Sequence, residues 1–423
     1  MQKIGMTELF RVFLRIGLLS FGGPAAQIAL MHRELVERRA WLNESQFLNA
    51  LGFCMLLPGP EAMQLATYAG WRLRGTLGGL MAGLLFVLPG AVVILALAVL
   101  YVSYAELHLV TVLFLGIKAA VVAVVIQALL RIAGKALIQR RHWLIAGLSF
   151  IALFFFALPF PIVVLCAALL GYFSSTNAAQ GVETAALPRK RTAVNTAVLG
   201  AVVWFTPLVL VALLGAEQLL LDVAAFFSKL AVVTFGGAYA VLVYMAQDVV
   251  STFGWLEAPQ MIDALGLAET TPGPLILVTE FVGFLAGYNQ GGLVLGIAAA
   301  ALTLWVTFVP CFIWIFCGAP YLDWLAGQTR LKSALAAITA AVVGVMLNLS
   351  IWFALHVLFA EVDARHIGPL QLWQPQWQSL NLIALGLCAL GALLLFKLRF
   401  GVVRLLLSCA ALSWALSSFA VFA

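Results

Sequence analysis

Two short strings of helix-breaking residues recur in this chain at one fixed separation. The string Phe21-Gly22-Gly23 returns as Phe235-Gly236-Gly237, and Pro58-Gly59-Pro60 returns as Pro272-Gly273-Pro274, each 214 positions later. Over positions 21–60, fifteen of the forty residues are identical at that separation. The chain is therefore a tandem duplication, and its best-preserved residues are ones that interrupt helices.

The interruptions lie in a chain that no soluble core could bury. Hydrophobic residues make up 64% of it, charged residues only 9%, and the mean hydropathy is +1.09, whereas soluble domains carry about 25% charged residues. The apolar runs are continuous rather than alternating, which predicts an all-α polytopic membrane protein and argues against a β-barrel. The net charge of +6 follows from Arg and Lys in short loops and does not indicate nucleic-acid binding.

We expect six apolar segments in each half, and the interrupted segments are typical of a transport site. In the first half they cover about 6–32, 46–73, 76–104, 108–133, 142–158 and 160–175; in the second, about 220–247, 260–287, 291–318, 333–359, 379–397 and 401–421. This organisation predicts an N-terminal repeat (1–175), a polar linker with one joining helix (176–219) and a C-terminal repeat (220–423). Residues 117–122 match 338–343 at a separation of 221, which predicts about two extra helical turns in the third segment of the second repeat.

Loop charges predict that the two repeats have opposite topology. The loop after the fourth segment is basic in the first half and has no basic excess in the second; its charged residues are Arg131, Lys135, Arg140 and Arg141, against Glu361, Asp363 and Arg365. The positive-inside rule then places the N-terminus in the cytoplasm and the C-terminus outside. Each of the first two segments is either a broken crossing or a re-entrant hairpin, and short half-helices with basic flanks favour hairpins.

The breakers predict an anion site. Proline favours the first position of a helix, so Pro60 and Pro274 should start new helices within the membrane, where free N–H groups and the helix dipole attract anions. The backbone and hydroxyl candidates are Ser20, Phe21, Gly22, Gly23, Pro58, Gly59, Pro60, Thr234, Phe235, Gly236, Gly237, Pro272, Gly273 and Pro274. The alternative is that the breakers only kink helices for packing.

Charged residues near the breakers are the other candidates. Arg15 and Lys229 each precede a Phe-Gly-Gly string by six residues, and Lys118 lies within an apolar segment; intramembrane cations often mark a pathway. They could also snorkel to the interface or pair with a carboxylate. Glu61, Glu269 and Glu280 are candidates for proton coupling, with helix capping or ion pairing as the alternative.

The two motifs resemble those of the chromate ion transporter family. Phe21-Gly22-Gly23-Pro24, Trp41-Leu42 and Leu57-Pro58-Gly59-Pro60-Glu61 are similar to its first domain, and the second copy to its second domain. The second copy departs from the first at Ala238, in place of Pro24, and at Leu275, in place of Glu61. The resemblance implies a long-chain, two-domain member in a prokaryotic plasma membrane that exports chromate, is driven by the proton motive force and confers chromate resistance.

Three classes of function were compared. A secondary transporter of a tetrahedral oxyanion, chromate or alternatively sulfate, fits best, with protons and the lipid bilayer as partners and a homodimer compatible with the sequence. An enzyme would need a cofactor motif, a metal cluster or a nucleophile with a base; the six cysteines and five histidines have no metal-binding spacing, so we expect no metal and no cofactor. A cation carrier using the three glutamates is the third class.

Overall fold

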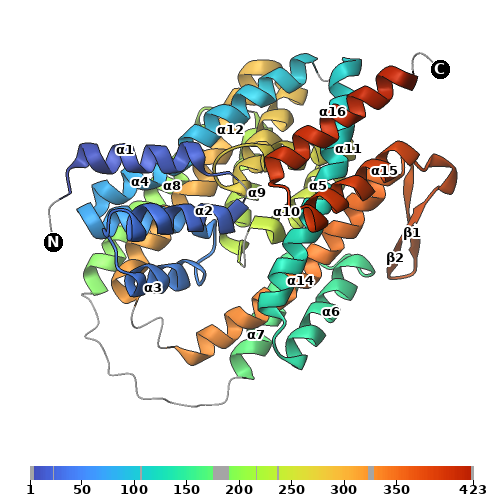
Figure 1. Cartoon of the computed structure of the whole chain (residues 1–423). Helices are drawn as coiled ribbons and strands as arrows, with labels where there is room; N and C mark the ends of the chain where they lie inside the picture. The colour runs from blue at the N-terminus through green and yellow to red at the C-terminus, as the bar shows by residue number, and fades with distance from the viewer. Residues whose placement is uncertain are drawn as a thin grey trace. The chain divides into compact units, whose positions relative to one another are not determined.

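The structure is a computed structural model that describes residues 4–21, 23–104, 107–174, 190–215, 217–235, 238–322 and 328–420. Its elements run in this order: α1 (Met6–Leu19), α2 (Gly23–His32), η1 (Arg33–Glu37), α3 (Glu44–Cys54), α4 (Glu61–Tyr104), α5 (His108–Ala136), α6 (Arg140–Phe154), α7 (Phe160–Phe173), α8 (Lys190–Leu213), α9 (Gln218–Val233), α10 (Ala238–Gln247), η2 (Asp248–Thr252), α11 (Ala258–Thr270), η3 (Leu275–Leu277), α12 (Val278–Gly318), η4 (Ala319–Tyr321), α14 (Thr329–Leu358), β1 (Val362–Ile367), β2 (Leu370–Pro375), η5 (Trp377–Ser379), α15 (Leu382–Ala392), η6 (Leu393–Lys397) and α16 (Val402–Ala420) (Figure 1).

The helical content confirms the predicted all-α membrane class. Within the described residues, five helices are long and apolar enough to cross a membrane. The interrupted segments also form as expected: α1 and α2 flank the first Phe-Gly-Gly string, and α2 doubles back beside α1 in Figure 1. A 14-residue helix such as α1 is about 21 Å long, too short for a full crossing.

The chain forms two compact units, each assembled from both halves of the sequence. The first contains Met1–Ala98, Gly171–Val241 and Thr271–Leu335; the second contains Val99–Leu170, Leu242–Thr270 and Ala336–Ala423. In the first unit α12 packs against α8 and α9, and in the second α5 packs against α11, α15 and α16. The division of the sequence into two repeats and a linker remains a prediction, and so does their inverted topology.

The longest helices of the first unit are hairpins. In α4 the backbone leaves the helix at Arg74 (φ −144°, ψ 22°) and Gly75 (φ 66°, ψ −159°). A β-carbon on Gly70 would lie 2.6 Å from Cβ of Ala82, although a straight helix would separate these residues by about 18 Å. The helix therefore folds back on itself, and close contact at Gly70 allows the two arms to meet.

The α12 helix repeats this hairpin. Its break lies at Gly291 (φ −145°, ψ 19°) and Gly292 (φ 73°, ψ −163°), 217 positions after the break in α4. Both helices also begin 217 positions apart, at Glu61 and Val278. The separation is thus 214 at the prolines and 217 at the hairpins, so three extra residues form the short η3 helix before α12 begins. The structural counterpart of Glu61 is therefore Val278 rather than Leu275, and part of the predicted insertion lies earlier than expected.

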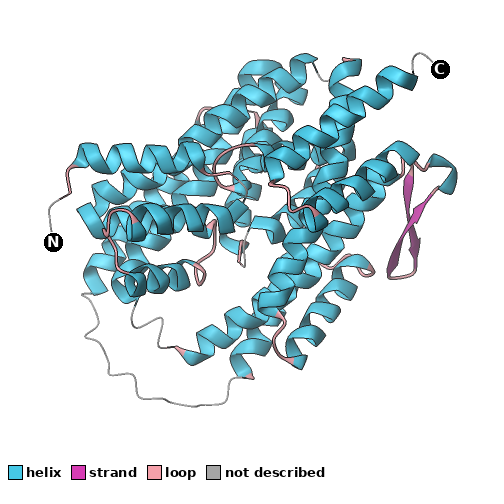
Figure 2. Ribbon diagram, viewed as in Figure 1, coloured by secondary structure: helices cyan, strands magenta, loops and turns pink. Residues whose placement is uncertain are grey.

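One element of the second unit was not predicted. Strands β1 and β2 pair antiparallel, with Val362 opposite Pro375 and Ile367 opposite Leu370, and Figure 2 shows this ribbon in magenta. Gly368, in the connecting turn, has a φ of +58°, a conformation that favours glycine. The sequence analysis read this stretch only as a loop with charges, because two short strands leave little periodic signal.

The hairpin geometry predicts a position-dependent effect of glycine substitution. Gly70→Ala should lower the free energy of unfolding by about 1–3 kcal/mol, because the new methyl group would overlap the opposite arm of α4. Gly147→Ala in α6 should be neutral or stabilise by up to about 1 kcal/mol, since nothing lies within 4 Å of its β-carbon position. Thermal unfolding of the purified variants in detergent measures both, and equal midpoints would contradict the close contact.

Candidate functional site

The breakers of the two halves are hydrogen-bonded to each other in the first unit. The N–H of Gly59 donates to the carbonyl of Thr234 (2.7 Å), and the N–H of Gly273 donates to the carbonyl of Ser20 (2.8 Å). Ser20 corresponds to Thr234, and Gly59 to Gly273, at the separation of 214. The same bond is therefore made twice, once in each direction, between the second breaker of one half and the first breaker of the other.

Backbone geometry explains the residue types at the second breaker of each half. Gly59 and Gly273 have φ values of +118° and +93°, which strain any residue with a β-carbon. Space is limiting too: a β-carbon would lie 2.9 Å from Sγ of Cys311 at Gly59, and 2.9 Å from Cδ1 of Leu277 at Gly273. Glycine is therefore the residue that suits both ends of the crossed hydrogen bonds.

Two glutamines complete the hydrogen bonding of the breakers, and the sequence analysis did not identify them. The amide nitrogen of Gln27 donates to the carbonyl of Gly273 (2.7 Å), and that of Gln64 donates to the carbonyl of Pro58 (2.7 Å). Within the described residues the amide oxygens of both glutamines are buried without a hydrogen-bond partner. In the sequence, each glutamine is indicated only as a polar residue in an apolar stretch, shortly after a breaker of the first half.

The structure changes the roles expected for several predicted donors. The N–H groups of Gly59 and Gly273 are occupied by carbonyl groups. The hydroxyl groups of Ser20 and Thr234 donate to the carbonyls of Ile16 (2.6 Å) and Leu230 (2.5 Å) in their own helices. These four groups therefore hold the breakers together in this arrangement and do not point free donors at an anion.

The other breaker residues that the structure describes differ in burial and in backbone conformation. Gly23 is the first residue of α2 and has a φ of +77°. Phe21 is exposed, Phe235 is half-buried, and Pro60, Pro272 and Pro274 are buried beside the crossed bonds, with Pro58 half-buried. Gly22, Gly236 and Gly237 fall outside the described residues.

The matched cations Arg15 and Lys229 are exposed on α1 and α9. Glu34 is a buried carboxylate in the stretch that follows α2, and it accepts hydrogen bonds from Arg38 (2.6 Å) and Arg39. The positive charge of Arg15 also helps to lower its pKa. Burial alone would raise the pKa of Glu34, but the hydrogen bond from Arg39 and the three nearby arginine charges outweigh it and lower the pKa. Arg15 therefore belongs to the electrostatic surroundings of Glu34, and its proposed role as a counter-charge for an anion remains a prediction.

Lys118 is paired with a carboxylate, the alternative that the sequence left open, and its role as a counter-charge remains a prediction. Its Nζ lies 2.9 Å from Oδ1 of Asp263 in the second unit, and the hydroxyl of Tyr101 donates to Oδ2 of the same carboxylate (2.9 Å). The side chains are largely buried, with 20% of Lys118 and 9% of Asp263 exposed. Asp263 was missed because it lies in a short segment, 145 positions from its partner.

The predicted proton-coupling carboxylates differ in their surroundings. Glu61 is the first residue of α4, where the helix dipole favours a carboxylate. Glu269 is buried near the end of α11. Glu280, on α12, is only 1% exposed, and its Oε2 atom has no hydrogen-bond partner among the described residues.

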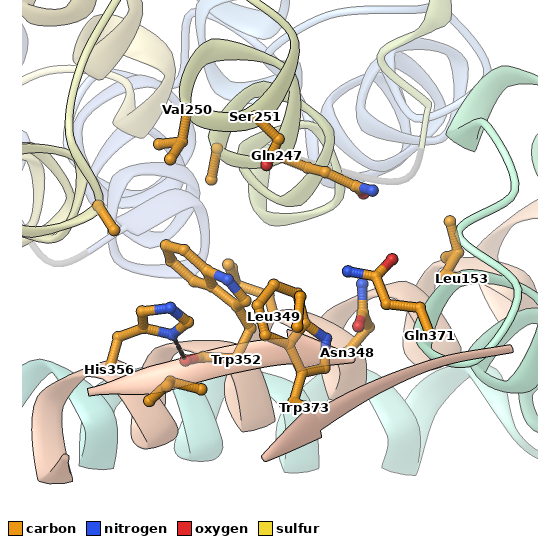
Figure 3. A pocket seen from close by; sticks show the side chains of 14 residues that line it. Leu153, Gln247, Val250, Ser251, Asn348, Leu349, Trp352, His356, Gln371 and Trp373 are labelled. Atoms are coloured by element: carbon orange, nitrogen blue, oxygen red, sulfur yellow. Dashed lines mark hydrogen bonds between the residues drawn. The ribbon is translucent and has the colours of Figure 1, made fainter. Parts of the chain in front are cut away.

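The second unit contains a cavity of about 340 Å³ (Figure 3). Its polar lining is almost uncharged: the amides of Gln247, Asn348 and Gln371 face it together with the indoles of Trp352 and Trp373. Residues of α14 and of both strands contribute, so the β-ribbon closes one side of the cavity. Neutral donors of this kind orient a polar ligand or water but supply no counter-charge.

The fold and the breakers define a multi-pass α-helical membrane protein with discontinuous helices crossed at one place, an arrangement found in secondary transporters. The sequence model of the family "Chromate transporter" matches residues 7–172 and 221–414, and the chain belongs to this family of transporters. The two matches start 214 positions apart, the separation of the breakers.

Individual proteins that this chain resembles are also named as transporters. The chain is 32% identical to the chromate transport protein of Pseudomonas aeruginosa over 417 residues, which covers 96% of this chain and 91% of that protein. It is 29% identical to a probable chromate transport protein of Synechococcus elongatus, covering 80% and 82%. An uncharacterized transporter of Bacillus subtilis, YwrA, is 31% identical over 167 residues, 93% of its own length but 38% of this chain. No solved structure matches.

The buried pair predicts a non-additive response to mutation. Asp263→Asn should lower the free energy of unfolding by about 3–5 kcal/mol, because it leaves the Lys118 charge buried and unpaired. The double variant Lys118→Met/Asp263→Leu should recover most of that loss, since no uncompensated charge remains. Tyr101→Phe, which removes one hydrogen bond, serves as the milder control. Denaturant unfolding in detergent distinguishes these cases, and a double variant as unstable as Asp263→Asn would refute the pairing.

Proposed function

We propose that this protein is a secondary active transporter that exports chromate from the cytoplasm across a prokaryotic plasma membrane. Export would be coupled to the proton motive force as an antiport and would confer chromate resistance. Family membership supports chromate as the substrate. The observation that carries the proposal is the reciprocal hydrogen bonding of the four breakers, which brings discontinuous helices from both halves to one place.

The proposed anion site consists of the breaker backbones and the helix starts beside them. Helices α2, α4 and α10 begin at or directly after a breaker, and α12 begins after the short η3 helix. Their positive dipole ends would attract a tetrahedral anion, and the first N–H groups of α2, α4 and α10 would donate to its oxygens. Phe21, Gly22, Gly23, Phe235, Gly236, Gly237 and the four breaker prolines would shape this site. Arg15 and Lys229 would attract the anion, and Lys118 would contribute when its pair with Asp263 opens.

The crossed bonds suggest how binding changes the structure. The N–H of Gly59 donates to a carbonyl of the other half, and an anion oxygen is a stronger acceptor than that carbonyl. An arriving chromate could therefore take the N–H groups of Gly59 and Gly273, release Ser20 and Thr234, and free the two halves to move relative to each other. In such an exchange each N–H keeps an acceptor, and the released carbonyls of Ser20 and Thr234 would need water or another donor.

Proton coupling is assigned to carboxylates near these elements. Glu61 starts α4 directly after Pro60, and Glu280 and Glu269 lie on the helices that flank the Pro272–Pro274 breaker. A carboxylate that gains a proton when the anion leaves would tie the two movements together. The N-terminus would be cytoplasmic and the C-terminus extracytoplasmic, and a homodimer is compatible with this arrangement.

Sulfate is the second candidate substrate, because it has the shape and charge of chromate and would accept the same hydrogen bonds. Uptake of labelled chromate into inverted vesicles under an imposed proton gradient tests the function, and competition by sulfate measures the preference. Absence of gradient-dependent uptake of both anions would reject the proposal. A cation carrier would instead keep its activity when Arg15 and Lys118 are both neutralised.

Substitution of the breaker glycines should separate a site from ordinary backbone strain. Gly59→Ala and Gly273→Ala should each lower chromate uptake at least about tenfold, the equivalent of about 1.4 kcal/mol, because the left-handed backbone and the crossed bond are lost together. Gly254→Ala also introduces a β-carbon at a positive φ (+61°), with milder strain and in open space, and should retain uptake within about twofold. Equal losses at all three positions would contradict a special role for the breakers.

A further inference from the structure

Three buried side-chain oxygens lie close together in the sequence of α12 and lack hydrogen-bond partners. Several other buried hydroxyls of this chain, such as those of Thr67 and Ser350, donate to the carbonyl four residues earlier. Within the described residues, Oγ1 of Thr303, Oγ1 of Thr307 and Oε2 of Glu280 have no hydrogen-bond partner. Their side chains are 0%, 3% and 1% exposed. Buried polar atoms without partners are rare and call for an explanation.

The three residues lie at one level of the α12 hairpin. Because the helix reverses at Gly291 and Gly292, its two arms run antiparallel. Gly283, three residues after Glu280, packs directly against the side chain of Thr303. Residues three or four apart share a helix face, so Glu280 faces the opposite arm at the turn occupied by Thr303 and Thr307.

The chemistry of this cluster calls for a cation. An ionised carboxylate buried without a partner costs several kcal/mol, and Glu280 makes no salt bridge to any residue that the structure describes. Carboxylate and hydroxyl oxygens are hard ligands that suit hard cations. One carboxylate balances one positive charge, whereas a divalent ion would leave an excess charge buried. A proton would bind only one of the three oxygen atoms.

We propose that Glu280, Thr303 and Thr307 form a binding site for a small monovalent cation, Na⁺. The ion would bind the carboxylate of Glu280 and the two threonine hydroxyls between the arms of α12. The assignment of a transport role to this ion rests on the proposed function, whereas the site itself does not. It would make Na⁺ a coupling ion in addition to, or in place of, the proton.

The site is connected to both breaker pairs in the first unit. The carbonyl of Thr307 accepts a hydrogen bond from Sγ of Cys311 (3.5 Å), and that sulfur fills the space beside Gly59. Glu280 lies six residues after Pro274 on the same stretch of chain. An ion that draws Thr307 and Glu280 together would therefore act on Gly59 through the turn from Thr307 to Cys311, and on the Pro272–Pro274 breaker through the six residues from Pro274 to Glu280.

The chain provides a matched control in its first hairpin. Thr67 in α4 packs against Gly83 as Thr303 packs against Gly283, but its hydroxyl already donates to the carbonyl of Met63 (3.0 Å). Thr67→Val removes a buried hydroxyl that also packs against a glycine of the facing arm, here from the first arm of the hairpin, without touching the proposed site. The test variants are Glu280→Gln and Thr303→Val/Thr307→Val, which keep side-chain size and are checked for folding by size-exclusion chromatography.

The experiment measures the melting temperature of the full-length protein in NaCl and in choline chloride at equal ionic strength and pH. Na⁺ should raise the melting temperature of the wild type and of Thr67→Val by roughly 2–4 °C. Glu280→Gln and the double threonine variant should lose the shift or need at least about tenfold more Na⁺ for it. Uptake of chromate by proteoliposomes should follow the same order when a Na⁺ gradient is imposed.

Two results would overturn the proposal. One is a melting temperature of the wild type that does not respond to Na⁺, which would leave the cluster to a proton. The other is a Na⁺ shift that survives unchanged in both test variants, which would place the ion elsewhere. Because the melting temperature does not depend on chromate, a Na⁺-dependent shift without any chromate or sulfate uptake would retain this site while rejecting the transport function.

Discussion

The fold depends on how broken helices satisfy their backbone groups away from water. Every unpaired N–H or C=O at membrane depth costs several kcal/mol, so unwound backbone persists only where protein supplies partners. In this chain each half supplies them for the other: Gly59 donates to Thr234, Gly273 donates to Ser20, and Gln27 and Gln64 cover two carbonyls that remain. Neither half alone supplies all the partners of its breakers, which is consistent with a first unit that contains segments of both halves of the sequence.

Local features of this arrangement were readable from the sequence, and long-range ones were not. The breakers, the duplication and the membrane class follow from residue types that constrain φ and from continuous apolar runs. The partner of Lys118 could not be inferred, because nothing near position 118 distinguishes Asp263 from other acidic residues. The same holds for Gln27, whose role depends on Gly273, a residue 246 positions away. The three-residue η3 insertion was obscured because identities are densest at the separation of 214 and the hairpins of α4 and α12 share few residues.

The candidate cations illustrate a general limit of charge patterns. Arg15, Lys118 and Lys229 were singled out because isolated charges in apolar segments are expensive. That cost can be offset by an anion in transit or by a resident carboxylate, and the sequence shows only the cost. The structure resolves one case outright, since Asp263 and Tyr101 bind Lys118 on α5 within one unit. A charge held this way can still take part in transport, but only by leaving its carboxylate, so any anion that reaches Lys118 has to compete with Asp263.

Duplication gives the two hairpins the same backbone but different chemistry. In α4, the hydroxyl of Thr67 and the amide nitrogen of Gln64 are bonded to backbone carbonyls, so the polar groups of this hairpin mostly serve its own stability. In α12, a carboxylate and two hydroxyls occupy the interior without such bonds. A buried carboxylate that lacks partners destabilises a hairpin more than a buried amide oxygen does, unless a ligand binds there. The difference between the two copies is therefore one of charge: the unsatisfied oxygen of Gln64 in α4 is neutral, whereas Glu280 in α12 is a carboxyl group.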